Sequence, residues 1–346
     1  MNEKAITKPT QTLDTLGCVA IGRNEGERLR QCLQSILGTV RSVVYVDSSS
    51  TDGSVELARS LGVEAIALDI SIPFSAARSR NEGFTHLLKQ YPQLEFVQFV
   101  DGDCEVADGW LELAHNALQT QPQVAVVCGR RRERYPEQSI YNRLCEMEWD
   151  TPVGEAKACG GDAMMQVRAF QEVGGFNPSL IAGEEPELCV RLRQKDWKIL
   201  RLDGEMTLHD AQMTRLGQWW KRSLRAGHAY AEGAWLHGRT PERHWVKESR
   251  SIWFWGVLLP LLALVLAGVT RGGSLLLFCA YPLLAYRIYR YLRQQGTDAQ
   301  DSALYAGFCV LGKFSQAQGQ FQFWLNRLLG KRRALVEYKI PSRESN

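Results

Sequence analysis

The sequence lacks several features that would narrow its class at once. Its 346 residues carry 41 Lys+Arg against 38 Asp+Glu, a net charge of only +3, and they include 6 histidines. It has no internal repeat and no low-complexity tract, so its composition is that of an ordinary globular protein, long enough for a large core or two domains. The first 16 residues are polar and contain Pro9, and we expect no signal peptide there.

The nine cysteines lack the pattern of a metal site or a disulfide framework. No two of them have the spacing of a zinc site, and their number is odd. We therefore expect reduced, mostly buried cysteines that act as small apolar residues in a cytosolic setting.

Charge is unevenly distributed along the chain. Residues 239–346 carry 15 Lys+Arg against 6 Asp+Glu, whereas the residues before them carry 26 against 32. A mildly acidic N-terminal part followed by a basic, apolar C-terminal part indicates a soluble domain followed by a region that contacts anionic lipid. Nucleic acid could also attract the basic end, but its basic residues flank apolar runs, so we expect a membrane and no nucleic acid as partner.

Short apolar runs alternate with amphipathic segments over the first 130 residues. The predicted strands cover residues 16–21, 42–46, 64–68, 96–100 and 124–128, and the predicted helices cover 27–37, 54–61, 75–89 and 110–119. This alternation predicts an α/β fold, a mostly parallel sheet with helices on both faces. Ligands of such folds bind beyond the carboxyl ends of the strands.

Acidic and glycine-rich clusters follow the predicted strands. Asp101 and Asp103, on either side of a glycine, suit a divalent metal that holds a diphosphate, although such triplets are also common in turns. The glycines at 160–161 would let the main chain approach a ligand, unless they form a plain loop. Crowding of Glu184 and Glu185 raises the pKa of a carboxyl, as a general base needs, but acidic residues also favour helix N-termini.

Three further polar features each allow two interpretations. Asp47 ends a predicted strand before a Ser/Thr/Asp-rich turn, where a carboxylate can accept hydrogen bonds from a base or ribose, or can cap a helix. His209 trails the acidic cluster by one helix and one strand, although a lone histidine is more often structural. The arginines within 130–134 form either a solvated charge run or a phosphate-facing loop.

In their order, these motifs resemble the GT-A glycosyltransferases, and specifically glycosyltransferase family 2. The resemblance covers about residues 16–225; each motif is weak alone, but the whole set in the family's order and at plausible spacing is a strong signal. The matching stretches are Arg23-Asn24-Glu25-Gly26, Val46-Asp47 with Asp52-Gly53-Ser54, Arg80-Asn81-Glu82-Gly83, Asp101-Gly102-Asp103, Gly160-Gly161, Gly174-Gly175-Phe176, Glu184-Glu185 with Glu187-Leu188, and His209.

The resemblance implies roles for the matched residues. Asp101 and Asp103 look like the family's metal-binding DXD, which grips Mg²⁺ or Mn²⁺ across the diphosphate, with Asp103 as the more direct ligand and His209 as a further contact. Glu185 falls where the family has the aspartate that acts as catalytic base, and Glu184 is the alternative. Glu for Asp departs from the family pattern, keeping the carboxylate but adding a methylene. The residues implied to contact the nucleotide-sugar donor are Asn24, Glu25, Asp47, Arg78, Arg80, Asp101, Gly160 and Gly161.

The C-terminal part contains long apolar runs. Residues 252–269 have no charge and carry two tryptophans at one end, which suits a membrane-spanning helix. A shorter run, 275–286, could complete a hairpin or be re-entrant, and 303–311 predicts an amphipathic interfacial helix. Basic residues flank both outer ends of the two runs, so both ends should face the cytoplasm. The alternative is a buried helical hairpin of a soluble domain.

A partial resemblance lies just before this region. Residues 212–216 are similar to the Gln-x-x-Arg-Trp motif of processive synthases, but Leu216 stands where Trp is expected. With the basic and aromatic residues 218–222 they predict an interfacial or acceptor-side helix. Two apolar runs, rather than many, argue against a processive polymer exporter.

These predictions combine into one organisation and one function. Residues 1–16 form a polar tail, 17–238 the GT-A catalytic domain, 239–330 a membrane-associated helical hairpin plus interfacial helix, and 331–346 a basic tail. We expect an inverting enzyme that moves a sugar from a nucleotide-sugar, with a UDP-sugar as the expected donor, to a hydroxyl of a lipid-linked or envelope-glycan acceptor. It would serve polysaccharide biosynthesis at the inner membrane, with the catalytic domain facing the cytoplasm. The alternatives are a nucleotidyltransferase of similar fold and a non-catalytic membrane scaffold.

Overall fold

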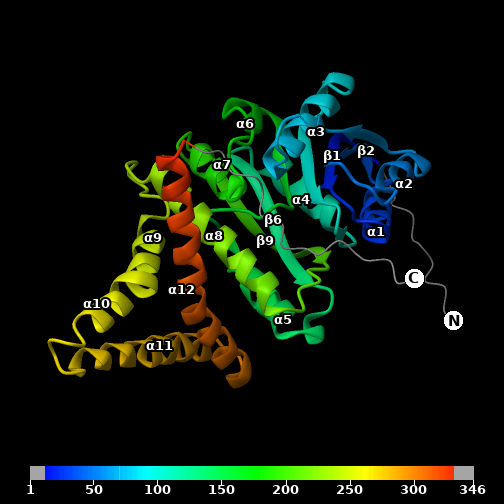
Figure 1. The fold of residues 1–346 in the computed structure, drawn as a ribbon. Helices are drawn as coiled ribbons and strands as arrows, with labels where there is room; N and C mark the ends of the chain where they lie inside the picture. The colour runs from blue at the N-terminus through cyan, green and yellow to red at the C-terminus, as the bar shows by residue number, and fades with distance from the viewer. Residues whose placement is uncertain (1–11, 70, 331–346) are drawn as a thin grey trace. The chain divides into compact units, whose positions relative to one another are not determined.

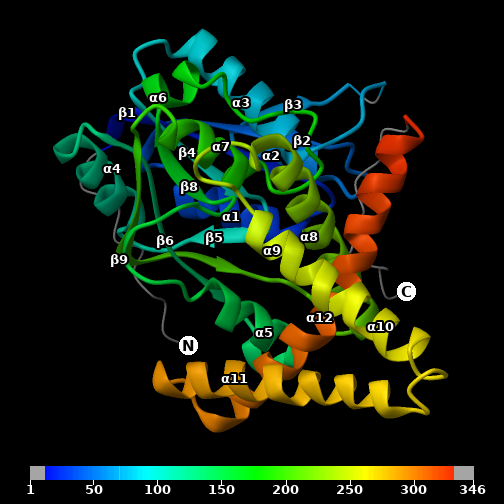
Figure 2. The same cartoon turned by 90° about the vertical axis from the view of Figure 1, so that its left-hand side faces the viewer.

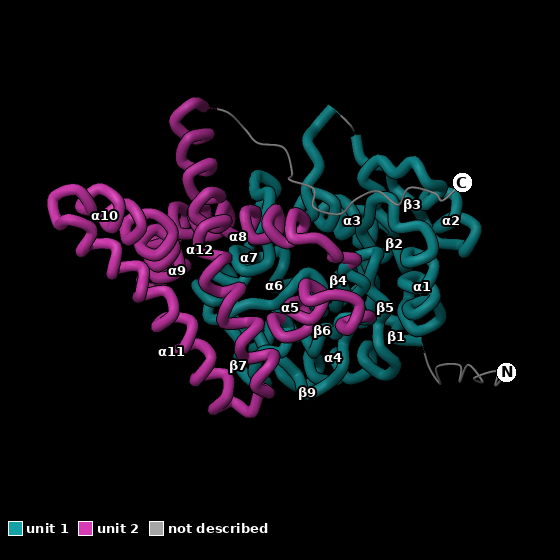
Figure 3. Tube along the Cα trace, turned by 60° about the horizontal axis from the view of Figure 1, so that its bottom comes forward, with its two compact units in different colours: residues 1–134, 149–211 teal, residues 135–148, 212–346 magenta. Residues whose placement is uncertain are grey.

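The computed structural model describes residues 12–69 and 71–330, which divide into two compact units (Figure 3). Of the described residues, unit 1 holds those up to Arg134 together with Trp149–Ala211, and unit 2 holds Tyr135–Glu148 and those from Gln212 onward. This division does not coincide with the domain boundary predicted at residue 238, and the predicted domains stay a prediction. The predicted C-terminal tail, 331–346, and residues 1–11 of the N-terminal one lie outside the described residues.

Unit 1 contains a nine-stranded sheet with helices packed against it (Figure 1). Its strands are β1 (Leu13–Gly22), β2 (Val40–Asp47), β3 (Glu64–Ala67), β4 (Phe96–Asp101), β5 (Cys104–Val106), β6 (Val124–Glu133), β7 (Gly154–Glu155), β8 (Ala163–Gln166) and β9 (Lys198–His209). Its helices are α1 (Glu27–Ile36), α2 (Ser54–Ser60), α3 (Ala76–Gln90), α4 (Trp110–Thr120), α6 (Val167–Glu172) and α7 (Glu184–Arg193).

The sheet is mixed, although most of its strands share one direction. The order is β3-β2-β1-β4-β8-β6-β9-β5, with β7 on β9. The first four strands are parallel, β8 runs antiparallel between β4 and β6, and β9 is parallel to β6. Consecutive residues of β1, such as Cys18, Val19 and Ala20, are fully buried, so both faces of the sheet are covered. The predicted α/β architecture is confirmed.

Strand β6 is longer than the sequence predicts and includes the first three arginines of the run, Arg130, Arg131 and Arg132. The side chains of Arg131 and Glu133 are 16% and 0% exposed, whereas those of Arg130 and Arg132 are 36% and 37% exposed. Such alternation is the two-residue period of a strand. The run is therefore neither a loop nor uniformly solvated.

Unit 2 is helical, and its longest helix packs along another through close backbone contacts (Figure 2). A Cβ atom at Gly227 would lie 2.1 Å from the Gln316 carbonyl oxygen, and one at Gly319 would lie 2.0 Å from that of Leu224. Only glycine permits this approach of α12 to α8. The helices are η1 (Pro136–Gln138), α5 (Ile140–Trp149), α8 (Leu216–His237), α9 (Val246–Trp253), the π-helical turn η2 (Phe254–Leu258), α10 (Leu259–Val265), the 3₁₀ segment η3 (Gly273–Cys279), α11 (Ala280–Gln294) and α12 (Ala299–Leu328).

Helices α9, η2 and α10 form one continuous helix over Val246–Val265. Among the described residues it is the one helix whose length and mean hydropathy of 1.3 suit a membrane span, and only 17% of its apolar window is buried. This observation is weak evidence for membrane association. The second apolar run forms η3 and the start of α11, and the predicted short helix at 303–311 is part of the 30-residue α12. The predicted hairpin and interfacial helix stay predictions.

Candidate active site

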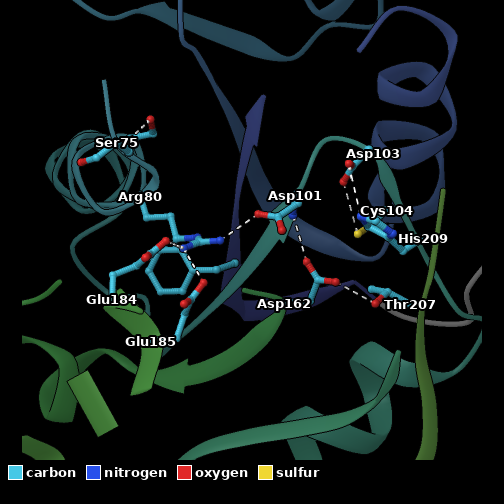
Figure 4. A network of polar contacts seen from close by, with 12 residues as sticks. Ser75, Arg80, Asp101, Asp103, Cys104, Asp162, Glu184, Glu185, Thr207 and His209 are labelled. Carbon is cyan, nitrogen blue, oxygen red and sulfur yellow. Dashed lines mark hydrogen bonds and ion pairs between the residues drawn. The ribbon is translucent and has the colours of Figure 1, made fainter. Parts of the chain in front are cut away.

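Side chains from α3, α7 and several strand ends converge in unit 1 (Figure 4). The β1–β2 register pairs Gly22 with Asp47, and the β1–β4 register pairs Ile21 with Asp101. Asp47 and Asp101 thus lie at the same edge of the sheet, two strands or roughly 10 Å apart. The sheet therefore presents the predicted nucleotide-binding and metal-binding carboxylates along one edge, as parallel strands in this order require.

Arg80 on α3 lies at the centre of three carboxylates. Its Nη2 is 2.8 Å from Asp101 Oδ1, and its Nη1 is 2.9 Å from Glu185 Oε1 and 3.2 Å from Glu184 Oε1. The Arg80 side chain is 2% exposed, and its guanidinium also lies over the ring of Phe176. A buried cation needs such partners, because an unpaired charge in the interior is strongly disfavoured.

Gly161 makes room for this cluster. A Cβ atom at Gly161 would lie 2.5 Å from Arg80 Nη2, 2.9 Å from Asp101 Oδ2 and 3.1 Å from Glu185 Oε1. Any side chain there would push the three charged groups apart. The neighbouring Gly160 is not crowded in this way, since no heavy atom lies within 4 Å of its built Cβ.

A second buried ion pair fixes the backbone of Asp101. The Asp101 N–H donates to Asp162 Oδ1 at 3.0 Å, and Thr207 Oγ1 donates to Asp162 Oδ2 at 2.7 Å. Arg131 Nη2 lies 2.7 Å from the same Asp162 oxygen and 3.4 Å from Asp101 Oδ2, and its guanidinium covers the ring of Trp149. Asp162 is fully buried. These contacts hold Asp101 in place from the side opposite Arg80.

Asp103 points away from Arg80 and meets His209 instead (Figure 4). His209 Nε2 lies 3.3 Å from Asp103 Oδ2, and its Nδ1 lies 3.7 Å from Glu133 Oε2. Ligand atoms of Asp103, Cys104 and His209 all lie within 4.8 Å of one another. Burial raises the pKa of the Cys104 thiol well above its usual value, so the thiol stays protonated and is a poor ligand. A carboxylate and an imidazole remain, a donor pair that fits a hard or borderline divalent cation.

The surroundings shift the pKa values of Glu185 and Asp101 in opposite directions. Burial, reinforced by the charge of Glu184 and opposed by Arg80, raises the pKa of Glu185 to about 7. Burial would also raise the pKa of Asp101, but Arg80 and Arg131 outweigh it and hold that pKa well below its ordinary value. Asp101 is thus a permanent anion at neutral pH, whereas Glu185 can exchange a proton there.

The predicted nucleotide-contact residues before α2 form a separate polar cluster, made by the loops that follow β1 and β2. Asp47 is 1% exposed and accepts hydrogen bonds from the Tyr45 hydroxyl at 2.9 Å and the Ser50 N–H at 2.8 Å. Asn24 Oδ1 accepts from the Thr51 N–H at 2.8 Å, and Glu25 pairs with its neighbour Arg28. A hydrogen bond from the Thr51 N–H to Asn24 thus links the loop that follows β2 to the loop that follows β1.

Arg78 is the predicted site residue that lies apart from both groups. Its Nη1 donates to the carbonyl oxygens of Asp69 and Ile72, and the residue is partly exposed. It therefore holds the loop before α3 in this structure, and its predicted contact with the nucleotide stays a prediction.

Three residues of this cluster, Asp162, Glu133 and Thr207, were not predicted from the sequence, and Arg131 was predicted only as part of a charged run. Asp162 directly follows the predicted glycine pair, so its position was a usable signal. Arg131 and Glu133 alternate with Arg130 and Arg132, and interpreting that alternation as a strand would have placed the first pair on the inner side.

Comparisons with known proteins agree with this geometry. Residues 19–171 match the family model described as Glycosyl transferase family 2. The structure resembles a mannosyltransferase from Pyrobaculum calidifontis, solved with GDP-Man and Mn²⁺, with a TM-score of 0.57 and 18% identity over 90% of this chain and 88% of that one. Glucosyl-3-phosphoglycerate synthase from Mycobacterium tuberculosis, solved with Mn²⁺, UDP and glucosyl-3-phosphoglycerate, aligns with a TM-score of 0.45 and 14% identity over 63% of this chain and 78% of that one. A search of curated protein sequences gave no match.

The family match falls on the elements that carry much of the candidate site. Residues 19–171 include the end of β1, all of β2 to β4, α3, the Asp101–Asp103 segment and Asp162. The structural similarity to the mannosyltransferase extends over 90% of this chain. Residues 19–171 thus form a glycosyltransferase family 2 domain, and the protein is a glycosyltransferase with the GT-A fold.

Proposed function

We propose that this glycosyltransferase inverts the anomeric centre of a nucleotide-sugar by a metal-assisted single displacement, with Glu185 as its general base. The observation that carries this proposal is the convergence of Glu185, Arg80 and Asp101 over Gly161. It gives one carboxylate a pKa of about 7 beside a second that stays ionised. A general base is most effective when its pKa lies near the working pH.

In the proposed reaction an acceptor hydroxyl gives its proton to Glu185 while its oxygen attacks the anomeric carbon of the donor sugar. The carbon–oxygen bond to the nucleoside diphosphate breaks on the opposite face, so the configuration inverts and the leaving group departs with the bonding electron pair. Arg80 holds Glu185 and Asp101 in place by ion pairs, so we assign it a positioning role. Glu184 is the alternative base; it is more buried than Glu185 and also contacts Arg80.

The residues that would hold a divalent cation are Asp103 and His209, with Asp101 as a weaker candidate. Asp103 and His209 face one another, whereas Asp101 already faces two guanidinium groups. When bound, Mg²⁺ or Mn²⁺ would stabilise negative charge on the leaving diphosphate. The mannosyltransferase that shares this fold was solved with Mn²⁺ and GDP-Man, which supports such a cofactor and a nucleotide-sugar donor.

We assign the base and ribose of the donor to the polar cluster that contains Asn24, Glu25 and Asp47, with Gly160 beside the donor sugar. Asp47 lies at the same sheet edge as Asp101, two strands away. We keep a UDP-sugar as the expected donor and a lipid-linked or envelope glycan as the acceptor. The exposed apolar helix over Val246–Val265 supports association with a membrane. We keep the inner membrane, with the catalytic domain in the cytoplasm, as part of the proposal.

A sugar-nucleotide hydrolysis screen tests the proposal. The full chain is incubated with UDP- and GDP-sugars in the presence of Mn²⁺, Mg²⁺ or EDTA, and the released nucleotide is quantified. We expect release of nucleoside diphosphate from one donor, lost in EDTA. Replacing Asp103 by Ala should reduce this rate by on the order of 10²–10³.

The matched control is Asp108→Ala, an exposed aspartate in the loop that follows β5. It should keep the wild-type rate. Pyrophosphate release from a nucleoside triphosphate would favour the nucleotidyltransferase alternative instead. Absence of UDP or GDP binding with Mn²⁺ in calorimetry would favour the non-catalytic scaffold.

A further inference from the structure

Unit 2 contains an apolar groove between α8, the continuous helix Val246–Val265 and the C-terminal part of α12. Its volume is ≈ 570 Å³, within the range of small-molecule sites. Three indole rings line it, those of Trp235, Trp253 and Trp324. The remaining walls are largely aliphatic, including Leu258 and Leu261. This lining suits a hydrocarbon chain.

Two arginines, Arg239 and Arg250, also line the groove. Both are exposed, and neither has an ion pair or side-chain hydrogen bond within the described residues. By contrast, two other arginines of unit 2 are paired: Arg222 with Glu148 at 2.7 Å, and Arg143 with Asp301. Arg239 and Arg250 thus offer the groove two cationic groups free to bind an anion. Guanidinium groups bind phosphate oxygens well, often in a bidentate manner.

The groove opens on the face of a helix suited to lipid. Phe254, Leu258 and Leu261 line the groove and are 44%, 47% and 54% exposed. Tryptophan and arginine beside an apolar helix face are typical of the boundary between a bilayer and water. The Arg327 guanidinium lies 3.5 Å from the centre of the Trp235 ring, which keeps further positive charge near this edge.

We propose that this groove binds one lipid with a phosphate headgroup from the bilayer. The chain of the lipid lies against the indoles and leucines, and the phosphate binds Arg239 and Arg250. The groove supplies complementary groups for both parts of such a molecule: apolar walls for the chain and two unpaired guanidinium groups for the anion. This inference rests on the membrane placement in the proposed function and not on the chemistry assigned to Glu185.

Titration of delipidated full-length protein in dodecyl maltoside micelles tests the proposal. The probes are dioleoyl phosphatidic acid, dioleoyl phosphatidylcholine and inorganic phosphate, and the readout is the Kd from microscale thermophoresis. We expect phosphatidic acid to bind at least tenfold more tightly than either of the others. Equal binding of phosphatidylcholine would overturn the role of the arginines, and equal binding of inorganic phosphate would overturn the role of the apolar walls.

The variant R239Q/R250Q should weaken phosphatidic acid binding at least tenfold. The matched control, K247Q/R287Q, removes the same charge from exposed residues that do not line the groove, and it should bind as the wild type does. The variant R239K/R250K keeps the charge and should lose less than R239Q/R250Q. Equal losses in R239Q/R250Q and the control would overturn the proposal.

Two further measurements distinguish a lost lipid site from a lost fold and from a dimer interface. Circular dichroism melting of each variant identifies a loss of fold. If R239Q/R250Q does not fold, A234F replaces it, since this variant narrows the groove without changing its charge and should also weaken phosphatidic acid binding. A dimer in light scattering that dissociates in R239Q/R250Q, without phosphatidic acid binding, would assign the groove to a second copy of the chain and overturn the proposal. Sugar-nucleotide hydrolysis by the same preparation reports on Glu185 and Asp103 independently.

Discussion

The arginines at the candidate site of unit 1 and those at the groove of unit 2 lie in opposite surroundings. In unit 1, Arg80 is 2% exposed and contacts three carboxylates, and Arg131 bridges Asp162 and Asp101. In unit 2, Arg239 and Arg250 are exposed beside an apolar groove and have no partner within the described residues. Burial forces a cation to find a counter-charge, whereas an exposed guanidinium can remain available for a ligand.

The apolar residues differ between the units in a corresponding way. The strands of unit 1 are buried on both faces, so its leucines and valines form a closed core. In unit 2, Leu264, Val265 and Leu276 are 62%, 65% and 73% exposed. Exposed apolar surface on this scale marks a contact with a partner or a membrane. Unit 1 therefore uses its charges internally to build a site, and unit 2 presents both charge and apolar surface outward.

The largest expected effect tests whether the unit 1 cluster is catalytic or only structural. Replacing Glu185 by Gln should reduce transfer by on the order of 10³, because the base is lost while the shape is kept. Nucleotide affinity should be unchanged, since Glu185 is not assigned to the nucleotide. Single-turnover rates and calorimetry measure the two quantities.

The control is Glu184→Gln, the same change at the adjacent residue, which also contacts Arg80. It should reduce transfer less than tenfold. A larger loss in Glu184→Gln than in Glu185→Gln would make Glu184 the base.

A second test addresses the paired arginines. Arg131→Met should lower the free energy of unfolding by about 3 kcal/mol, because Asp162 would keep its buried charge without a cation. Arg132→Met, one residue along the same strand, removes an exposed pair with Glu205 and should cost less than about 1 kcal/mol. Denaturation by urea measures both. Equal costs would show that burial does not separate the two arginines.

Much of this arrangement follows from local sequence patterns. Apolar runs ending in polar residues predict β2 and β4, and a parallel order then brings Asp47 and Asp101 to one edge. Glu185 and His209 follow from the family's order of motifs. Hydrophobic periodicity also predicts α1 closely, because Leu29 and Leu33 lie on one face.

The contacts that fix the site depend on residues far apart in the chain. Asp162 meets Arg131 only because β8 inserts antiparallel between β4 and β6, and no local pattern announces that pairing. The length of α12 was missed for a different reason. Its packing residues include Gly312, Ser315 and Gly319, which are small and carry no hydrophobic periodicity.

A third test uses pH to examine the pKa of Glu185. The folded-state pKa of about 7 exceeds the ordinary value of 4.5, so the protonated folded form is favoured, and stability falls as pH rises between these values. Glu185→Gln mimics the protonated form. It should nearly match the wild type at pH 4 and exceed it by about 3 kcal/mol at pH 8. Urea denaturation at the two pH values checks this.

The wild-type rate of transfer should change in the opposite sense to stability. Transfer should fall as pH drops below about 7, since Glu185 takes up a proton and ceases to be a base. A rate that is constant between pH 8 and pH 6 would contradict both the pKa and the assignment.

The smallest expected effect on stability is that of replacing Arg250, an exposed arginine of unit 2. Arg250→Met should change the free energy of unfolding in detergent by less than about 0.5 kcal/mol, because Arg250 is exposed and has no carboxylate partner within the described residues. The same measurement on Arg143→Met provides the contrast, since Arg143 pairs with Asp301 in unit 2. A large loss in Arg250→Met would mean that Arg250 stabilises the fold. In that case Arg250 would be a structural residue, and the groove would have one cation fewer to bind a ligand. The difference between the paired arginines of unit 1 and the available arginines of unit 2 would then not hold for Arg250.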